Sequence, residues 1–409
     1  MKILHVNFSD NKGGAAISVM RLHSFLLSKG IDSNLLVSDK EIDDENIISI
    51  NKTSEKIYNI LKSTINRNLS IVFKTANKNT HSLNLIPSKL LKIINNFKAD
   101  IVNLHWIGNE TLSIKQISKI ESKVVWTIHD MWPFCGAEHY TFDLRYKDGY
   151  ERNNRPVYEK GIDLNRYIWN QKNKYFYNIK KIHCTSKWMY DRLQESKLFK
   201  KAQIAEIPLL LDQTFWTKIT DSNTARKILG LDKNKKIITF GSDNYLGNER
   251  KGFSYFLEII KKFRDNNNYQ FVVFGENNFQ KLNRVLNKSN LDSVTINLGK
   301  ISDNQSLRLL YSATDLIISP STLESYGLIV SEAQHMGTPS LIFQNTGSTS
   351  IVEHKITGYV AKYKSLEDMF EGMSWCIDNL KNKVKISELI TKKFDSSKIM
   401  NKYLNFLNQ

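Results

Sequence analysis

Short apolar runs alternate with amphipathic stretches along nearly the whole chain, and the alternation occurs in two successive series. In the first series, strand-like runs are predicted at 3–8, 34–37, 101–106, 124–128 and 182–184, with helical stretches such as 15–27 and 187–194 between some of them. In the second, strand-like runs fall at 236–240, 271–274, 294–298, 316–318 and 340–343, with helices at 253–263, 280–286, 305–312 and from about 328. Continuous apolar strands between helices are typical of parallel sheets covered on both faces. The pattern therefore predicts an α/β protein with two doubly wound, Rossmann-like domains.

The join between the two series is predicted near Glu206. A chain of 409 residues exceeds the size at which one hydrophobic core usually stops growing, so two domains are expected. They are assigned to residues 1–205 and 206–393, and the last helix, within 394–409, is expected to pack away from the second sheet and complete the first domain. Ligands of open parallel sheets bind beyond the carboxyl ends of the strands, so the loops after strands are the candidate sites.

One such loop in the second series carries two adjacent cations. Arg250 and Lys251 precede Gly252 and a helix, in a loop that begins at Gly241. Two cations beside a helix N-terminus can neutralise a diphosphate, and arginine can do so with two hydrogen bonds. A solvated basic pair is the alternative, and the adjoining glycine favours the binding site.

The segment "LESYGLIVSEAQHMGTP" places Glu324 and Glu332 eight positions apart around a glycine. A loop carboxylate at Glu324 can accept hydrogen bonds from sugar hydroxyls, and Glu332, inside the following helix, can accept them from a ribose diol. The backbone amides of Tyr326, Gly327 and Leu328 then remain for a phosphate or a departing oxygen. Two solvated acids on a helix are the alternative. The preceding strand and the glycine favour a nucleotide-sugar site.

In the first series, Gly13 and Gly14 stand between the first strand and its helix. Glycine lets a ligand approach the backbone closely, and the free N–H groups of the helix favour an anion. A tight strand-to-helix turn explains the pair equally well.

Histidines end two further strands. His129 and Asp130 follow one strand and precede the aromatic Trp132, and His105 ends another. A lone histidine is more often structural than catalytic. The strand-end position, the polar neighbour and the aromatic side chain favour ligand contact for His129, whereas His105 remains open between the two roles.

Basic residues exceed acidic ones, and the formal net charge is +17. Much of the excess lies at 51–100, where lysines alternate with isoleucine, leucine and phenylalanine. This mixture suits binding to an anionic membrane surface. The alternative interpretations are binding to nucleic acid and a lysine-rich face that is simply solvated. Nucleic acid is supported by nothing except the charge, whereas a membrane surface also fits the apolar residues. A peripheral contact with an anionic membrane is therefore the favoured interaction.

The composition favours a cytoplasmic protein. The N-terminus lacks the apolar core of a signal peptide, and no window approaches the roughly 18 consecutive apolar residues of a membrane span. Cys135, Cys184 and Cys376 lie too far apart for a zinc pattern and are interpreted as reduced thiols. The sequence offers no candidate metal ligands.

Together these motifs resemble the retaining family 4 glycosyltransferases of the GT-B fold. The donor region of that family resembles "ESYGLIVSE", "AQHMGTP" and "STSIVEHKITGYVA", and "GGAA", "WTIHDMWPF", "CTSKWMYDRLQES", "ERKGF" and "YSATDLIISPS" occur in the expected order. The resemblance spans nearly the whole chain. It is greatest to a bacterial subgroup that assembles exopolysaccharide, capsule or O-antigen units, and it implies two domains facing each other across a cleft.

The resemblance also implies roles for the predicted site residues. Glu324 would contact the donor hexose and Glu332 the nucleotide ribose. Lys251, with Arg250, would hold the diphosphate and stabilise the leaving nucleotide. The full expected set is catalytic residues His129, Arg250, Lys251 and Glu324; donor contacts Gly13, Gly14, Gly241, Arg250, Lys251, Glu324, Tyr326, Gly327, Leu328 and Glu332; and acceptor-side residues His105, Asp130 and Trp132.

The implied reaction moves a hexose from a nucleotide diphosphate sugar to a lipid-linked saccharide at the inner face of the cell membrane. His129 would contact the transferred sugar. Neither a metal nor another cofactor is expected, because cationic side chains and amides can stabilise the leaving group. UDP is the favoured nucleotide of the donor, and GDP is the alternative. The resemblance also implies attack on the same face of the sugar, which requires no protein nucleophile.

Three departures from the family pattern stand out. Ser242 and Asp243 occupy the place where relatives carry an arginine, which leaves that charge to Arg250. Leu209 and Leu210 replace an Asn-Gly pair at the domain join. Relatives carry several cysteines after the "HDMW" stretch, where this chain has Cys135 followed by "GAEH". A non-catalytic GT-B partner protein, a nucleic-acid-binding protein and a nucleotide-sugar epimerase are the competing hypotheses.

Overall fold

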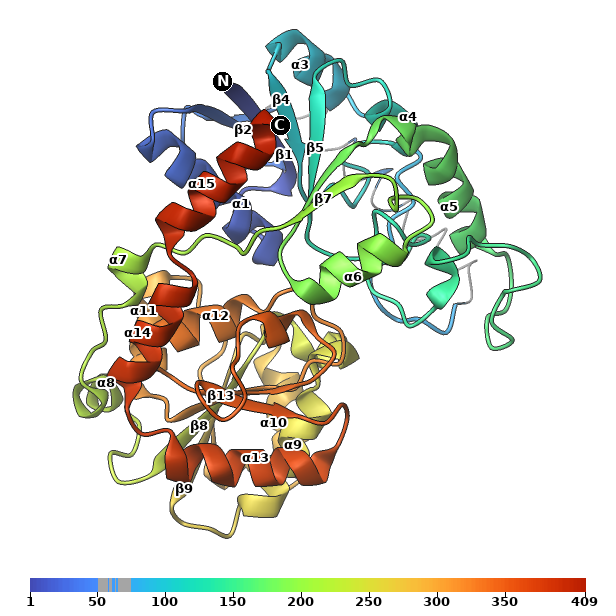
Figure 1. The fold of residues 1–409 in the computed structure, drawn as a ribbon. Coiled ribbons are helices and arrows are strands. Elements are labelled where there is room, and N and C mark those ends of the chain that lie inside the picture. Colours follow the sequence, from blue (N-terminus) through green and yellow to red (C-terminus); the bar gives the residue numbers. More distant parts are fainter. Residues whose placement is uncertain (51–57, 59–60, 63, 65–74) are drawn as a thin grey trace. The chain divides into compact units, whose positions relative to one another are not determined.

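The computed structural model describes residues 1–50, 58, 61–62, 64 and 75–409 and divides the chain into two compact units (Figure 1). Unit 1 contains Met1–Leu210 and Ile399–Gln409, and unit 2 contains Leu211–Lys398. The chain therefore passes between units after Leu210 and after Lys398, a few residues beyond the expected join near Glu206. Most of the basic stretch at 51–74 lies outside the described residues.

Unit 1 is built on a parallel seven-stranded sheet in the order β3-β2-β1-β4-β5-β6-β7. Its strands are β1 Lys2–Ser9, β2 Asp32–Asp39, β3 Ile47–Ser49, β4 Ile101–Leu104, β5 Lys123–Ile128, β6 Lys181–Cys184 and β7 Gln203–Glu206. Its helices are α1 Gly13–Ser28, α3 Leu90–Phe97, α4 Ile114–Ile117, α5 Leu164–Tyr175, α6 Lys187–Glu195 and most of α15 Ser396–Asn408. The chain order reverses between β1 and β4, which defines the switch point of the sheet.

Unit 2 contains a parallel six-stranded sheet in the order β10-β9-β8-β11-β12-β13. Its strands are β8 Lys236–Gly241, β9 Tyr269–Phe274, β10 Thr295–Asn297, β11 Leu316–Ser319, β12 Ser340–Phe343 and β13 Gly358–Ala361. Its helices are α7 Gln213–Trp216, α8 Ser222–Leu229, α9 Phe253–Phe263, α10 Phe279–Lys288, α11 Asn304–Ala313, α12 Leu328–His335, α13 Leu366–Asn379 and α14 Lys383–Lys393. The switch point lies between β8 and β11.

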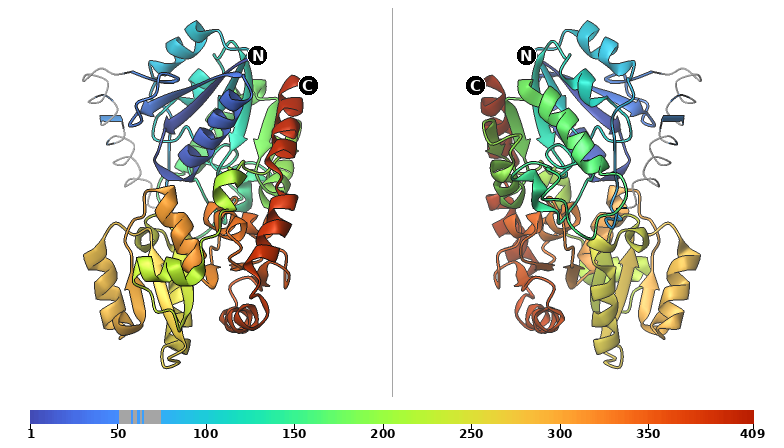
Figure 2. Two further views of the ribbon diagram at one scale, coloured as in Figure 1. Left: turned by 90° about the vertical axis from the view of Figure 1, so that its left-hand side faces the viewer. Right: turned by 90° about the vertical axis from the view of Figure 1, so that its right-hand side faces the viewer.

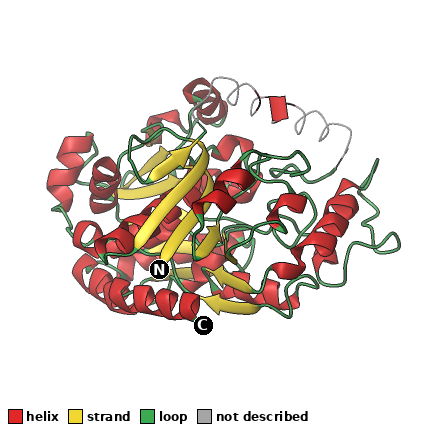
Figure 3. Cartoon of the chain, turned by 90° about the horizontal axis from the view of Figure 1, so that it is seen from above, coloured by secondary structure: helices red, strands yellow, loops and turns green. Residues whose placement is uncertain are grey.

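The apolar strand runs follow from burial on both faces of each sheet. In β8 of unit 2, Ile238 and Phe240 pack in one core cluster, whereas Ile237 packs in the other. Successive strand side chains point to opposite faces, so both faces need apolar residues. Helices (red in Figure 3) accompany the strands (yellow), and Figure 2 shows them on both sides of each sheet. The prediction of two doubly wound, Rossmann-like sheets is confirmed.

The C-terminal helix α15 contributes to the core of unit 1 through Tyr403. Its hydroxyl accepts a hydrogen bond of 2.7 Å from the Asn103 side-chain amide, and its ring lies 5.4 Å from that of His183, centroid to centroid. Lys402 Nζ donates to the Glu206 carbonyl at 2.7 Å, and Lys181 Nζ donates to the Phe406 carbonyl at 3.1 Å. These contacts attach the last residues of the chain to β4, β6 and β7.

We expect Tyr403→Ala to lower the free energy of unfolding of unit 1 by about 3–5 kcal/mol, because it empties a buried aromatic site. It also leaves the Asn103 amide without this acceptor. Urea denaturation, with hydrogen exchange to identify the unit affected, measures the loss. Asn405→Ala, at an exposed position of the same helix, is the control and should change stability by less than about 0.5 kcal/mol. Equal effects of the two substitutions would contradict the anchoring role.

Candidate functional site

The loops after β8 and β11 meet at the switch point of unit 2. Lys251 Nζ donates to Glu324 Oε2 at 2.6 Å, and an Arg250 guanidinium nitrogen lies 3.6 Å from the same oxygen. Arg250 also donates to the Leu323 carbonyl at 2.8 Å, and the Thr322 amide donates to the Arg250 carbonyl at 2.7 Å. Residues more than seventy positions apart in the sequence thus form one constellation at the edge where ligands of such sheets bind.

This constellation holds one anion against two cations in a nearly buried setting. Burial alone would raise the pKa of the Glu324 carboxyl, but the charges of Lys251 and Arg250 outweigh burial and hold that pKa below its ordinary value. Burial lowers the pKa of Lys251, an effect that Glu324 opposes. The Lys251 side chain is still 20% exposed. The three groups therefore carry one net positive charge, which favours an anionic ligand.

Glycine makes the close approach of the two loops possible. Gly252 has φ +74°, and a Cβ there would lie 1.9 Å from the Pro320 carbonyl oxygen. Gly327 has φ +102° and precedes α12 without a side-chain cap. Its amide and those of the first helical turn form an N-terminal donor group of the kind that binds anions. Both positions therefore require glycine for geometric reasons.

Other predicted donor residues lie deeper in unit 2. Glu332 is 4% exposed, and its Oε2 accepts a hydrogen bond of 3.1 Å from the Tyr311 hydroxyl of α11. Tyr326 is buried beside Gly327. Gly241 has a packing reason to be glycine, because a Cβ there would lie 2.0 Å from the ring of Phe274. Packing therefore accounts for a glycine at position 241 without the predicted contact to the donor.

In unit 1, the predicted histidines line a pocket at the carboxyl ends of the strands. His105 follows β4, His129 follows β5, and both contribute to the lining together with His183 and Tyr403. The segment 207–210, which includes the departures Leu209 and Leu210, forms an apolar wall of the same pocket. Apolar walls with a few convergent polar groups are typical of the lining of a ligand site.

The histidines of this pocket are neutral at pH 7. Burial lowers the pKa of His129 and of His183 to about 4, and it lowers the pKa of His105 well below its ordinary value. Nearby histidines contribute to the lower values of His105 and His129. The pocket therefore presents hydrogen-bonding groups without charge, in contrast to the charged loops of unit 2.

Asp130 and Trp132 are hydrogen-bonded inside unit 1. Asp130 Oδ2 accepts hydrogen bonds of 2.6 Å from Trp106 Nε1 and from His139 Nδ1. Trp132 is 2% exposed, and its indole N–H donates to the Ser82 carbonyl at 2.7 Å. Both residues shape the loop after β5, and neither presents free polar surface for the predicted acceptor contact.

Gly13 and Gly14 are the first two residues of α1, whereas the sequence placed them just before a helix at 15–27. Gly13 has φ +84°, with no atom within 4 Å of the position that a Cβ would occupy, so its backbone conformation alone favours glycine. The residue before it, Lys12, pairs with Asp39 at 2.7 Å and with Glu41 at 2.5 Å. The cation next to the start of α1 is therefore paired with two carboxylates.

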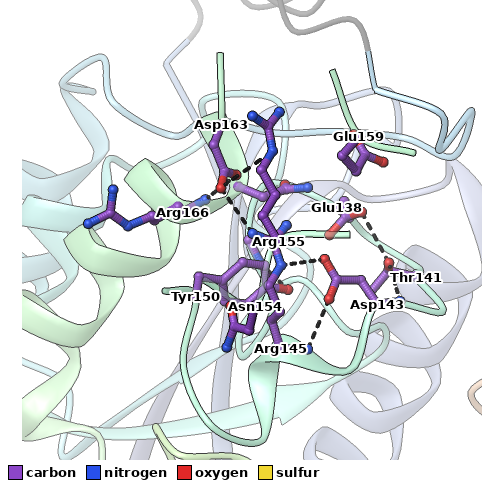
Figure 4. Close-up of polar contacts among 12 residues, drawn as sticks. Glu138, Thr141, Asp143, Arg145, Tyr150, Asn154, Arg155, Glu159, Asp163 and Arg166 are labelled. Carbon is purple, nitrogen blue, oxygen red and sulfur yellow. Dashed lines mark hydrogen bonds and ion pairs between the residues drawn. The ribbon is translucent and has the colours of Figure 1, made fainter. Parts of the chain in front are cut away.

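A polar network that the sequence did not reveal organises the chain between β5 and α5 (Figure 4). Asp143 accepts from the Arg145 side chain at 2.7 Å, and Arg145 donates onward to Asp163 at 3.0 Å. Glu138 Oε1 accepts from Asn77 at 2.9 Å and from Thr141 at 3.0 Å. The charged residues are spread too widely in the sequence to form a recognisable motif.

The described residues contain no group of three or more His, Cys, Asp or Glu side chains arranged to hold a metal ion. Cys135, Cys184 and Cys376 are buried and form no disulfide. Within the part of the chain that the structure covers, no helix combines the length and hydrophobicity needed to cross a bilayer.

Comparison with known families identifies the class of protein. Residues 12–214 match the family model described as Glycosyltransferase Family 4, and residues 221–393 match the model described as Glycosyl transferases group 1. The fold resembles the crystal structure of HepE from Anabaena in complex with UDP and glucose, with a TM-score of 0.69, 14% identity and 100% of both chains covered. The chain is a glycosyltransferase of the GT-B type, with a family 4 region followed by a group 1 region.

Curated relatives agree with this assignment. An uncharacterized 41.2 kDa protein in the cps region of Klebsiella pneumoniae is 24% identical over 91% of this chain and 93% of its own. A UDP-Gal:alpha-D-GlcNAc-diphosphoundecaprenol alpha-1,3-galactosyltransferase of Escherichia coli is 25% identical over 48% of this chain and 53% of its own. Uncharacterized glycosyltransferases of Methanocaldococcus jannaschii and Haemophilus influenzae are matched over only 38% and 40% of their length.

We expect Gly252→Ala to destabilise unit 2 more than Gly230→Ala does. Both glycines have positive φ, +74° and +66°, so each alanine costs about 1–2 kcal/mol for conformation alone. Gly230 has nothing within 4 Å of the added Cβ, whereas Gly252 meets the Pro320 carbonyl. Urea denaturation should show a further loss of about 1–3 kcal/mol for Gly252→Ala. Equal losses would show that the two loops separate easily.

We expect the stability of unit 1 to fall with rising pH because of Glu138. Burial raises the pKa of Glu138 from its ordinary 4.5 to about 7 in the folded chain. A raised folded-state pKa means that the contribution to stability is complete below about pH 4.5 and is lost as the pH rises through 7. Between pH 5 and pH 8 the wild type should lose about 2–3 kcal/mol relative to Glu138→Gln, measured by urea denaturation. Glu151→Gln, at an exposed position, is the control, and a matching profile for it would contradict the assignment to Glu138.

Proposed function

We propose that this glycosyltransferase moves a hexose from a nucleotide diphosphate sugar to a lipid-linked saccharide with retention of configuration. A UDP-sugar is the favoured donor and a GDP-sugar is the alternative. In the reaction, the bond between the anomeric carbon and the diphosphate oxygen breaks and the nucleotide diphosphate leaves. An acceptor hydroxyl forms the new glycosidic bond on the same face and gives its proton to the departing diphosphate oxygen. No protein nucleophile is required.

The observation that carries this proposal is the contact of Lys251 and Arg250 with Glu324 at the switch point of unit 2. The departing diphosphate gains negative charge, so cations fixed next to it stabilise the transition state more than the ground state. Glu324 keeps the two cations in place, and its own oxygens can accept hydrogen bonds from hexose hydroxyls. The proposed roles of Lys251, Arg250 and Glu324 thus follow from one geometry.

The remaining donor contacts are assigned around this centre. The amides of Gly327 and Leu328 at the start of α12 would bind a phosphate oxygen. Glu332, next to Tyr311, would take the ribose diol after a rearrangement of that hydrogen bond. Because two cations and several amides can neutralise the diphosphate, the proposal includes no metal and no other cofactor.

The donor and acceptor classes come from relatives. The Escherichia coli relative is named as using UDP-Gal and a diphosphoundecaprenol-linked sugar, and the Klebsiella relative lies in a cps region. HepE was crystallised with UDP and glucose. We therefore assign this chain to bacterial surface polysaccharide assembly at the inner face of the membrane. A non-catalytic partner protein is the alternative, and it does not require a diphosphate-binding cation pair.

We expect a UDP-sugar to raise the melting temperature of the purified chain, because a ligand that binds only the folded state stabilises it. Lys251→Met and Glu324→Gln should abolish the shift or reduce it strongly. Both should lower the rate of transfer to a polyprenyl-diphosphate sugar by about 100- to 1,000-fold, the usual effect of removing one transition-state contact.

The control pair is Lys261→Met and Glu258→Gln. Lys261 and Glu258 form an exposed ion pair of 2.7 Å on α9 and have the same residue types as the site pair. These controls should retain the melting shift and the transfer rate. Unchanged transfer in Lys251→Met would overturn the site assignment. Absence of any shift with UDP- and GDP-sugars, together with no transfer, would favour the non-catalytic alternative.

A further inference from the structure

Three histidines on adjacent strands of unit 1 form a continuous hydrogen-bonded chain. His5 lies in β1, His105 follows β4 and His129 follows β5, and these strands are neighbours in the sheet. His5 Nδ1 lies 2.9 Å from His105 Nε2, and His105 Nδ1 lies 3.0 Å from His129 Nε2. Both ring nitrogens of His105 are therefore used, and the chain connects the interior of unit 1 with the pocket that His129 lines.

The three rings are neutral, which restricts how protons can be arranged. Burial lowers the pKa of His5 to about 3 and of His129 to about 4, and the pKa of His105 lies well below its ordinary value. A neutral imidazole has one N–H donor and one lone pair. Consequently all hydrogen bonds in the chain point the same way, either outward to His129 or inward to His5.

The inner end of the chain decides between these two directions. His5 is fully buried, and its Nε2 has no hydrogen-bonding partner among the residues that the structure describes. With inward bonds this nitrogen would carry a buried N–H without an acceptor, whereas with outward bonds it carries only a lone pair. Buried donors without partners are rarer in proteins than buried acceptors without partners. The outward arrangement is therefore the stable one.

The outer end then has a defined chemistry. His129 Nε2 accepts from His105, so the proton of His129 resides on Nδ1. That nitrogen makes no hydrogen bond to any described residue, and it remains for the contents of the pocket. We propose that His5 and His105 are positioning residues that fix His129 as a hydrogen-bond donor toward an oxygen of the bound sugar or acceptor, and prevent it from acting as a base.

The role toward a sugar rests on the proposed function, whereas the proton arrangement is a property of unit 1 that can be measured without substrate. Two-bond proton–nitrogen correlation spectra of the full chain labelled with ¹⁵N-histidine report the tautomer of each ring. His129→Gln identifies the His129 signals. We expect His5, His105 and His129 to be neutral at pH 7.5 and protonated at Nδ1, which is the minor tautomer of free histidine. Protonation of His129 at Nε2, or a charged ring, would overturn the proposal.

A matched pair of variants tests the part played by His5. In His5→Asn the amide nitrogen replaces Nδ1 as the donor to His105, whereas His5→Leu has no donor. We expect His5→Asn to keep His129 protonated at Nδ1 and His5→Leu to give a mixture of tautomers. Transfer activity, as kcat/KM, should fall about 3- to 10-fold in His5→Leu, the value of one neutral hydrogen bond, and should recover in His5→Asn.

The outcomes separate the two proposals. If His5→Asn and His5→Leu leave the same tautomer at His129, His5 does not set the direction of the chain and the inference fails. If the tautomers are as expected but the chain transfers no sugar, the proposed function fails and the proton arrangement stands. Should His5→Leu not fold, the wild-type spectrum alone still decides the direction.

Discussion

The close approach of the loops after β8 and β11 is the constraint on which the candidate site of unit 2 depends. Gly252 and the Pro320 carbonyl leave no room for a side chain between these loops. At this separation Lys251 Nζ reaches Glu324 Oε2 at 2.6 Å. The parallel sheet contributes the rest, because adjacent carboxyl ends bring two loops together that are distant in the sequence.

The two units use the same position in the sheet for opposite electrostatic purposes. In unit 2, Lys251, Arg250 and Glu324 stay charged because each is compensated by a neighbour. In unit 1, the corresponding strand ends carry histidines that burial keeps neutral. A charged group suits a diphosphate, which carries charge itself, and a neutral donor or acceptor suits a sugar hydroxyl. The proposed transfer of a sugar from a nucleotide diphosphate would use both kinds of group.

The sequence predicted what local patterns determine. Apolar runs between amphipathic helices predicted both sheets but missed the strands β3, β7 and β13. The strand-end positions of Lys251, Glu324 and His129 predicted candidate residues for the site. Their partners could not be predicted, because the contact of Arg250 with the Leu323 carbonyl or of His105 with His5 depends on which strands are adjacent. The same holds for Asp130 and Trp132, whose hydrogen bonds with Trp106, His139 and Ser82 join residues that are distant in the sequence.

The chain between β5 and α5 shows how a long loop can be held by buried polar side chains. Lys172 of α5 is fully buried, and its Nζ donates to the carbonyls of Trp132, Cys135 and Gly136. Burial lowers the pKa of Lys172 well below its ordinary value. Arg145 bridges Asp143 and Asp163 further along the same excursion (Figure 4). Removing one partner of such a buried network is costly, since the remaining charge or carbonyl loses its compensation. The loop that carries His129 is therefore fixed at its far end by Lys172 and at its strand end by His105, which is what a side chain needs to keep one orientation toward a ligand.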